Sequence, residues 1–199
     1  MIVVVTAAVE GTLDESLAIK IIEDAGGVPG PIYGKGGKAA LRRKVSGYNE
    51  AARRSPWLVL VDLDRDEDCA PPLCQAWLPA PAELMRLRVA VREAEAWLMA
   101  DRERFARFLG VRQGALPRDP ENVEDPKQLV VNLARGSSKR DIRADLVPRP
   151  EGGRIVGPAY TSRLIEYITE HWRPAVASLT SNSLDRCRTR LHELVEALR

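Results

Sequence analysis

Residues 57–64 read Trp-Leu-Val-Leu-Val-Asp-Leu-Asp, and this stretch decides how the rest of the chain is interpreted. A short continuous apolar run, bounded here by Ser55-Pro56, is typical of a strand that is buried on both faces of a sheet. The run ends in Asp62 and Asp64, which are two residues apart and on an extended chain point to the same side. We therefore expect a core strand that carries an acidic pair to one edge of the sheet.

The segments on either side of this strand alternate between strand-like and helix-like patterns. Expected strands cover 2–8, 28–33, 57–63 and 84–91, and expected helices cover 13–25, 38–54 and 73–78. Pro29 and Pro31 place the second strand at or near an edge, because proline cannot donate a hydrogen bond within a central ladder. This order predicts an α/β fold with a mostly parallel four-stranded sheet flanked by helices.

From Arg92 onward the pattern is helical. Helices are expected over 93–109, 126–134, 159–171 and 184–198, with loops over 114–125 and 135–157. We therefore expect an α/β core over 1–110 and a helical elaboration over 111–199 that packs on it, as a single domain overall.

Composition limits the classes of function. The net charge of the 199 residues is only +2, so any anionic partner must be held by local basic patches. The three cysteines are an odd count without zinc-type spacing, which favours a reducing cytoplasmic compartment. No apolar stretch approaches the roughly 20 residues that span a bilayer, so no membrane partner is expected.

Three acidic clusters follow expected strands: Glu10 after the first, Asp62 with Asp64 after the third, and Glu93 with Glu95 after the fourth. The carboxyl ends of parallel strands meet at one edge of a sheet, where ligands bind. Crowded carboxylates repel one another unless a cation neutralises them, and oxygen-only ligands suit Mg²⁺ or Mn²⁺. The alternatives are an ordinary surface turn for the aspartates and a helix start favoured by the macrodipole for the glutamates.

A glycine-rich basic segment follows the second expected strand. Residues 34–38 read Gly-Lys-Gly-Gly-Lys but lack the spacing of an ATP-hydrolysing P-loop, because Ala39 follows the second lysine. The stretch 35–54 holds seven basic residues and one acidic residue. It is either a solvated helix face or a phosphate-binding track beside the acidic site. For the track, the candidate residues are Lys35, Lys38, Arg42, Arg43 and Lys44.

A strand that ends in Val9-Glu10-Gly11, followed by a helix and by a strand that ends in Val61-Asp62-Leu63-Asp64, resembles the Toprim fold. That fold occurs in topoisomerases, primases and the nuclease part of overcoming-lysogenization-defect (OLD) nucleases. Nearly the whole chain also resembles a family of small uncharacterised bacterial Toprim-like proteins that are often encoded beside AAA-type ATPases. The stretches that carry this second resemblance are 34–37, 60–66, 92–101, 125–127 and 181–184.

The resemblance implies a Mg²⁺- or Mn²⁺-dependent, nuclease-like phosphodiesterase that acts on nucleic acid. In Toprim enzymes the first glutamate is a general acid/base or metal ligand, which would be Glu10 here, and the aspartate pair, here Asp62 and Asp64, holds the metal. OLD-type nucleases use further carboxylates, a role that would fall to Glu93 and Glu95. Lys127, after Asp125-Pro126, is a candidate for transition-state stabilisation.

Three questions stay open at this point. The chain carries no ATPase of its own, so a separately encoded AAA-type ATPase is a candidate partner. A catalytically inactive Toprim-like binding or partner subunit is an alternative to an enzyme. A nucleotide-handling α/β enzyme with an Asp-x-Asp pair, of the phosphatase or glycosyltransferase kind, is a further one.

Overall fold

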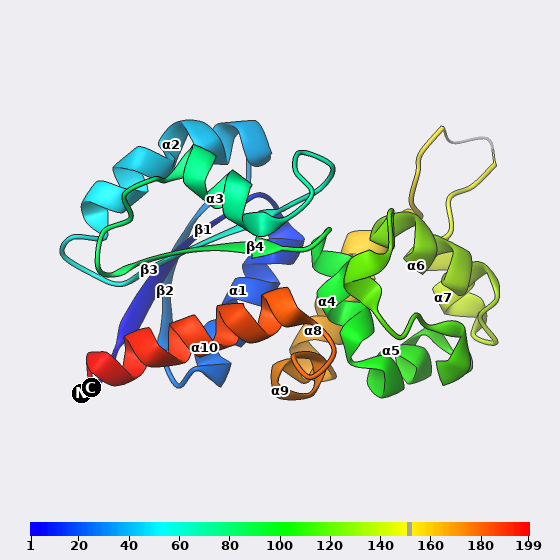
Figure 1. The fold of residues 1–199 in the computed structure, drawn as a ribbon. Helices are drawn as coiled ribbons and strands as arrows, with labels where there is room; N and C mark the ends of the chain where they lie inside the picture. Colours follow the sequence, from blue (N-terminus) through cyan, green and yellow to red (C-terminus); the bar gives the residue numbers. More distant parts are fainter. Residues whose placement is uncertain (151–152) are drawn as a thin grey trace. The chain divides into compact units, whose positions relative to one another are not determined.

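The strand β3 (Trp57–Asp62) is an inner strand of a four-stranded sheet in the computed structural model of the chain. The sheet has the order β2-β1-β3-β4, and every neighbouring pair is parallel. The other strands are β1 (Val4–Val9), β2 (Val28–Gly34) and β4 (Met85–Ala90), as Figure 1 shows. The predicted parallel α/β fold is confirmed, and the proline-containing β2 is an edge strand as expected.

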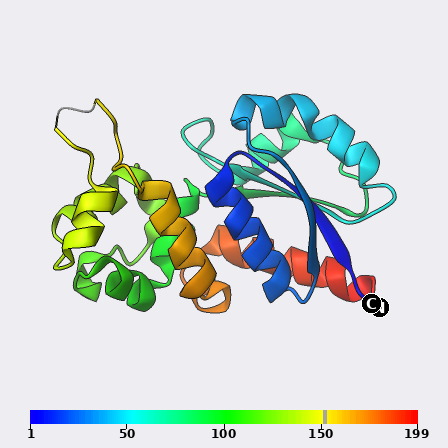
Figure 2. The ribbon, with the colours of Figure 1, turned by 180° about the vertical axis from the view of Figure 1, so that it is seen from behind.

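Helices cover both faces of this sheet. The face under α2 (Lys38–Ala51) and α3 (Ala70–Trp77) holds a continuous apolar cluster, while α1 (Thr12–Asp24) and α10 (Asn182–Ala197) lie on the opposite face (Figures 1 and 2). The cluster includes Leu41, Val59, Val61, Leu73 and Val89. Burial of both faces explains why β3 is continuously apolar from Trp57 to Val61 and not alternating.

The structure describes residues 1–150 and 153–199, and these form two compact units. The first unit comprises Met1–Val91 with Asn182–Arg199, and the second comprises Arg92–Ser181. The sequence places a boundary after residue 110, whereas the units divide after Val91, and α10 belongs to the unit that contains the sheet. Whether the two units fold as one domain is a separate question, and the single domain stays a prediction.

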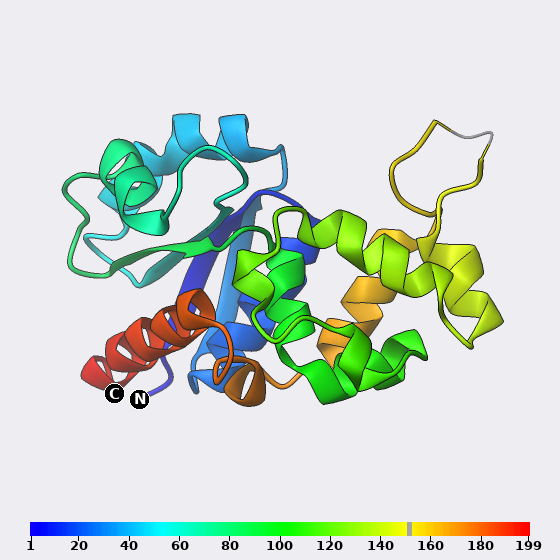
Figure 3. The same ribbon diagram turned by 45° about the vertical axis from the view of Figure 1, so that its right-hand side comes forward.

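The second unit is built from short helices, which Figure 3 shows from another side. They are α4 (Ala94–Ala100), α5 (Arg102–Leu109), α6 (Pro126–Arg135), α7 (Arg140–Leu146), α8 (Tyr160–Glu170) and α9 (Pro174–Ala177), with 3₁₀ turns over Gln113–Ala115 and Pro120–Asn122. None of the helices in the described part of the chain is both long and apolar enough to cross a membrane.

The single helix expected over 93–109 is wrong, because the structure divides it at Asp101. The backbone of Asp101 leaves the helical region, and its carboxylate accepts a hydrogen bond from the Arg104 amide at the start of α5. The carboxylate is fully buried and also binds Arg173, which fixes the break in place.

The loop expected over 135–157 contains α7. This helix buries Ile142 and Leu146, which are four residues apart and therefore lie on one face. Two apolar positions among charged residues are too few to produce a recognisable helical period in the sequence.

Gly34, at the end of β2, is a position where the backbone needs glycine. Its φ is +94°, and a Cβ there would overlap the carbonyl oxygen of Val9. We expect Gly34→Ala to lower the free energy of unfolding by about 1–3 kcal/mol, because both strain and overlap are introduced. The matched control is Gly47→Ala in the middle of α2, where a Cβ meets nothing within 4 Å and alanine should add about 0.5–1 kcal/mol. Urea denaturation measures both changes, and a neutral Gly34→Ala would contradict the assigned backbone.

Candidate functional site

Glu10 and Asp62 meet at the carboxyl edge of the sheet. Glu10 follows β1 directly and Asp62 is the last residue of β3, and these two strands are neighbours. The Asp62 amide donates a hydrogen bond to Oε1 of Glu10 at 2.9 Å. Chain order and a parallel sheet therefore bring together two acidic motifs that are 52 residues apart.

The environment of Glu10 favours a protonated carboxyl group. Burial raises the pKa of Glu10 to about 7, against lowering contributions from the Asp62 amide and Lys38. The negative charges of Asp14 and Asp64 raise it further. A carboxyl group with a pKa near 7 can both donate and accept a proton at neutral pH.

Asp14 also lies at this edge. It is the third residue of α1, not its N-cap, and its Oδ2 accepts a hydrogen bond from the Gly11 amide at 2.9 Å. This contact satisfies one of the free amides at the helix start and fixes the turn that follows Glu10.

Lys38, the first residue of α2, directs its side chain into the acidic loop that follows β3, residues 63–68. Its ammonium group donates to the carbonyl oxygens of Asp62 (2.6 Å) and Leu63 (3.1 Å) and to Oδ2 of Asp64 (2.8 Å). It also lies 2.8 Å from Oδ2 of Asp66. Burial works to lower the pKa of Lys38, but the hydrogen bonds to the two aspartates outweigh it and raise the pKa above its ordinary value. Lys38 is therefore a fixed positive charge at this edge.

Asp62 and Asp64 do not lie on one extended segment. The expectation that both side chains point to the same side of an extended chain therefore does not apply to them. β3 ends at Asp62, Leu63 is fully buried, and Asp64 has a φ of +53°. Aspartate tolerates this left-handed conformation better than most residues. The turn directs Asp64 toward Lys38, where the two side chains form the ion pair described above.

The backbone of the glycine-rich segment joins the same edge. The Lys35 amide donates to the carbonyl oxygen of Val9 at 2.9 Å, and the Gly37 amide donates to that of Glu10 at 3.0 Å. Lys35 and Gly37 both have a positive φ. These contacts hold the start of α2 beside the end of β1, and this placement brings Lys38 to the acidic loop.

The remaining basic residues of the predicted phosphate track differ in their surroundings. Lys35 forms an ion pair of 3.1 Å with Glu15, and the Arg42 guanidinium lies 6.0 Å from the centre of the Trp77 ring. Arg43 and Lys44 are exposed on α2. The five basic residues therefore do not share one environment: Lys38 contacts the acidic loop, Lys35 and Arg42 contact other side chains, and the remaining two face solvent. Their role in binding phosphate stays a prediction.

The donor chemistry of this edge suits Mg²⁺, because Glu10, Asp62 and Asp64 offer only oxygen. In this arrangement, however, the described residues contain no group of three or more His, Cys, Asp or Glu side chains that could hold a metal ion. Lys38 supplies the positive charge that crowded carboxylates require. A divalent ion bound here would therefore share the loop with Lys38, and water would supply its remaining oxygen ligands.

Glu93, Glu95 and Lys127 form a second cluster, within the second unit. The Lys127 ammonium lies 3.7 Å from Oε1 of Glu93 and 3.8 Å from Oε1 of Glu95. Oε2 of Glu93 accepts a hydrogen bond from the Lys127 amide at 3.1 Å, near the start of α6. Glu93 is also the N-cap residue of α4. Both glutamates thus lie at the start of α4, as the helix-start interpretation expects. A metal-binding role for them stays a prediction.

Tyr160 completes this cluster and was missed from the sequence. Its hydroxyl donates to Oε1 of Glu95 at 3.1 Å, across 65 residues of chain. Glu95 is only 1% exposed, and burial raises its pKa to about 7 against the opposing effect of Lys127. Trp97, which follows on α4, is fully buried, so its role is packing.

Comparison with protein-family models, with curated proteins and with solved structures finds no match to the chain. The Toprim-like resemblance therefore rests on the motifs themselves.

The hydrogen bond from Tyr160 to Glu95 is open to a direct test. We expect Tyr160→Phe to lower the free energy of unfolding by about 1–3 kcal/mol, because a buried carboxylate loses its hydroxyl donor. The matched control is Tyr167→Phe in the same helix, since the buried Tyr167 hydroxyl has no hydrogen-bond partner among the described residues and its loss should cost little. Urea denaturation compares the two, and equal losses would show that the Tyr160 hydroxyl does not stabilise Glu95.

Proposed function

We propose that the chain is a Toprim-like, Mg²⁺- or Mn²⁺-dependent phosphodiesterase that acts on nucleic acid. The observation that carries this proposal is the meeting of Glu10 with the end of β3, beside Asp64 and Lys38. A proton-transfer group with a pKa near 7, an acidic pair and a fixed cation gathered at the ligand-binding edge of a parallel sheet suit phosphoryl chemistry.

Each residue at this edge has a role in the proposal. Glu10 accepts a proton from the attacking group or donates one to the leaving oxygen. Lys38 balances the charge of the scissile phosphate, and Asp62 and Asp64 hold the metal ion. The ion, when bound, stabilises charge on the phosphate and lowers the pKa of a water molecule.

The second unit supplies further candidates. Glu93 and Glu95 are the proposed additional carboxylates, and Lys127 is the proposed cation of the same cluster. A cytoplasmic location and a separately encoded AAA-type ATPase as partner complete the proposal, and both rest on the interpretation of the sequence.

A catalytically inactive binding or partner subunit is the second candidate. The contacts of Lys38 favour it, because its ammonium group already neutralises Asp64 and Asp66 without a metal ion. A Toprim-like edge stabilised in this way could bind a phosphate or a partner protein without carrying out hydrolysis.

An assay of the full chain with Mn²⁺ on single- and double-stranded DNA and RNA separates the two candidates. We expect weak metal-dependent cleavage, which Asp62→Asn abolishes because the substitution weakens the hold on the metal ion. Glu10→Gln should lower the rate by about 10²–10⁴-fold, since the amide cannot transfer a proton.

The matched control for this assay is Asp68→Asn, an exposed carboxylate of the same acidic loop, which should keep the activity. Cleavage that persists unchanged in Asp62→Asn would show that the activity does not come from this site. If the folded wild-type protein cleaves nothing at any Mn²⁺ concentration, the proposal of an enzyme is overturned and the inactive subunit is favoured.

A further inference from the structure

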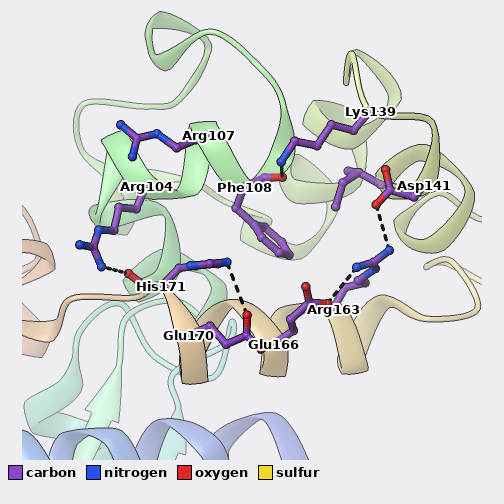
Figure 4. A pocket seen from close by; sticks show the side chains of 10 residues that line it. Arg104, Arg107, Phe108, Lys139, Asp141, Arg163, Glu166, Glu170 and His171 are labelled. Atoms are coloured by element: carbon purple, nitrogen blue, oxygen red, sulfur yellow. Dashed lines mark hydrogen bonds and ion pairs between the residues drawn. The ribbon is translucent and has the colours of Figure 1, made fainter.

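The second unit contains a cavity of about 500 Å³ that has no part in the chemistry described above. It lies between α5 and the segment from α7 to the end of α8, and Figure 4 shows its side chains. A cavity of this volume accommodates a small organic molecule. Its lining combines basic, acidic and aromatic side chains, which limits the kind of molecule that would fit.

Two of its cations have no carboxylate partner among the described residues. A guanidinium nitrogen of Arg104 donates to the carbonyl oxygen of His171 at 2.7 Å, and the Lys139 ammonium donates to that of Phe108 at 3.0 Å. Both side chains are held in place by neutral carbonyl groups, so their positive charges can bind an anion. Charge-assisted hydrogen bonds from such groups are the strong ones in anion recognition.

The acidic groups of the cavity belong to α7 and α8. Arg163 binds Asp141 at 3.0 Å, Asp145 at 2.7 Å and Glu166 at 2.9 Å, so one cation serves three carboxylates. Glu170 adds a further carboxylate, which is exposed and has only a distant contact of 3.9 Å with His171. The carboxylates of α7 and α8 therefore repel a purely anionic ligand and accept hydrogen bonds from N–H or O–H groups.

The cavity also has an aromatic part. Phe108 lies between Arg104 and Lys139 with its ring directed toward α8 (Figure 4). Its ring centre is 6.1 Å from that of His171 and 5.1 Å from that of the buried Tyr167. A planar aromatic group of a ligand can pack against this cluster.

We propose that this cavity binds a nucleoside phosphate, either free or as the 5′ end of a nucleic acid strand. The phosphate contacts Arg104 and Lys139, the base packs against Phe108 and His171, and N–H donors of the base reach Glu166 or Glu170. Guanine fits this arrangement best, because it presents two adjacent N–H donors on one edge to a carboxylate. The inference stands apart from the metal-dependent chemistry of the sheet edge.

Isothermal titration calorimetry of the full chain with GMP tests the inference in the presence of EDTA, so that failure of the proposed nuclease activity does not affect the result. We expect saturable binding of one GMP per chain, with guanosine and inorganic phosphate each binding at least about tenfold more weakly. Lys139→Gln and Arg104→Gln should each weaken GMP binding about tenfold, since each removes a charge-assisted contact.

The matched control is Arg140→Gln, which removes a neighbouring exposed charge that does not line the cavity and should leave the affinity unchanged. Because Arg104 also holds the end of α8, Glu170→Gln serves as a second variant at an exposed position and should weaken GMP binding severalfold. Tighter binding of a 5′-phosphorylated oligonucleotide than of GMP would assign the site to strand ends, and the reverse order would assign it to free nucleotides.

Three results would overturn the inference. One is the absence of GMP binding by the folded protein at millimolar concentration. Another is equal affinity for GMP and inorganic phosphate, which would leave the base without a role. The last is an unchanged affinity in both Lys139→Gln and Glu170→Gln.

Discussion

Four oxygen atoms lie within 3.1 Å of the ammonium nitrogen of Lys38, and the edge of the sheet depends on this arrangement. Two are backbone carbonyl oxygens at the end of β3, and two are carboxylate oxygens of Asp64 and Asp66. Without a cation here, Glu10 would lie beside a loop of uncompensated negative charge. Lys38 therefore lets the acidic residues stay close together.

The parallel sheet could be predicted from the sequence because its inner strands, β1 and β3, are mostly buried and almost wholly apolar. Pro29 and Pro31 predicted a strand at or near an edge, and β2 is an edge strand. The second unit was harder, because its helices are short and are fixed by contacts between distant residues. The break at Asp101 depends on Arg173, and α7 depends on burial of only two side chains, so neither leaves a periodic pattern in the local sequence.

The candidate site likewise has features that the sequence predicts and features that it does not. The meeting of Glu10 with Asp62 follows from topology, since both residues end neighbouring parallel strands. The turn at Asp64 does not follow, because a positive φ at aspartate cannot be read from an Asp-x-Asp pattern. Lys38 had a usable signal: helices begin at the same edge at which parallel strands end, so a lysine in the first turn of α2 is placed near the acidic loop. Tyr160 had none, because 65 residues separate it from Glu95.

A double-mutant cycle between Lys38 and Asp64 tests the role of Lys38 most directly. The free energy of unfolding is measured for the wild type, Lys38→Met, Asp64→Asn and the double variant. The account predicts a coupling energy of about 1 kcal/mol or more, because the two groups share a partly buried network of contacts. A reference cycle on Lys35 and Glu15, whose lysine is twice as exposed as Lys38, should give a smaller value, in the range of about 0–1 kcal/mol. Additivity of the Lys38 and Asp64 substitutions within about 0.3 kcal/mol would contradict the account, since Lys38 would then not hold the acidic loop together.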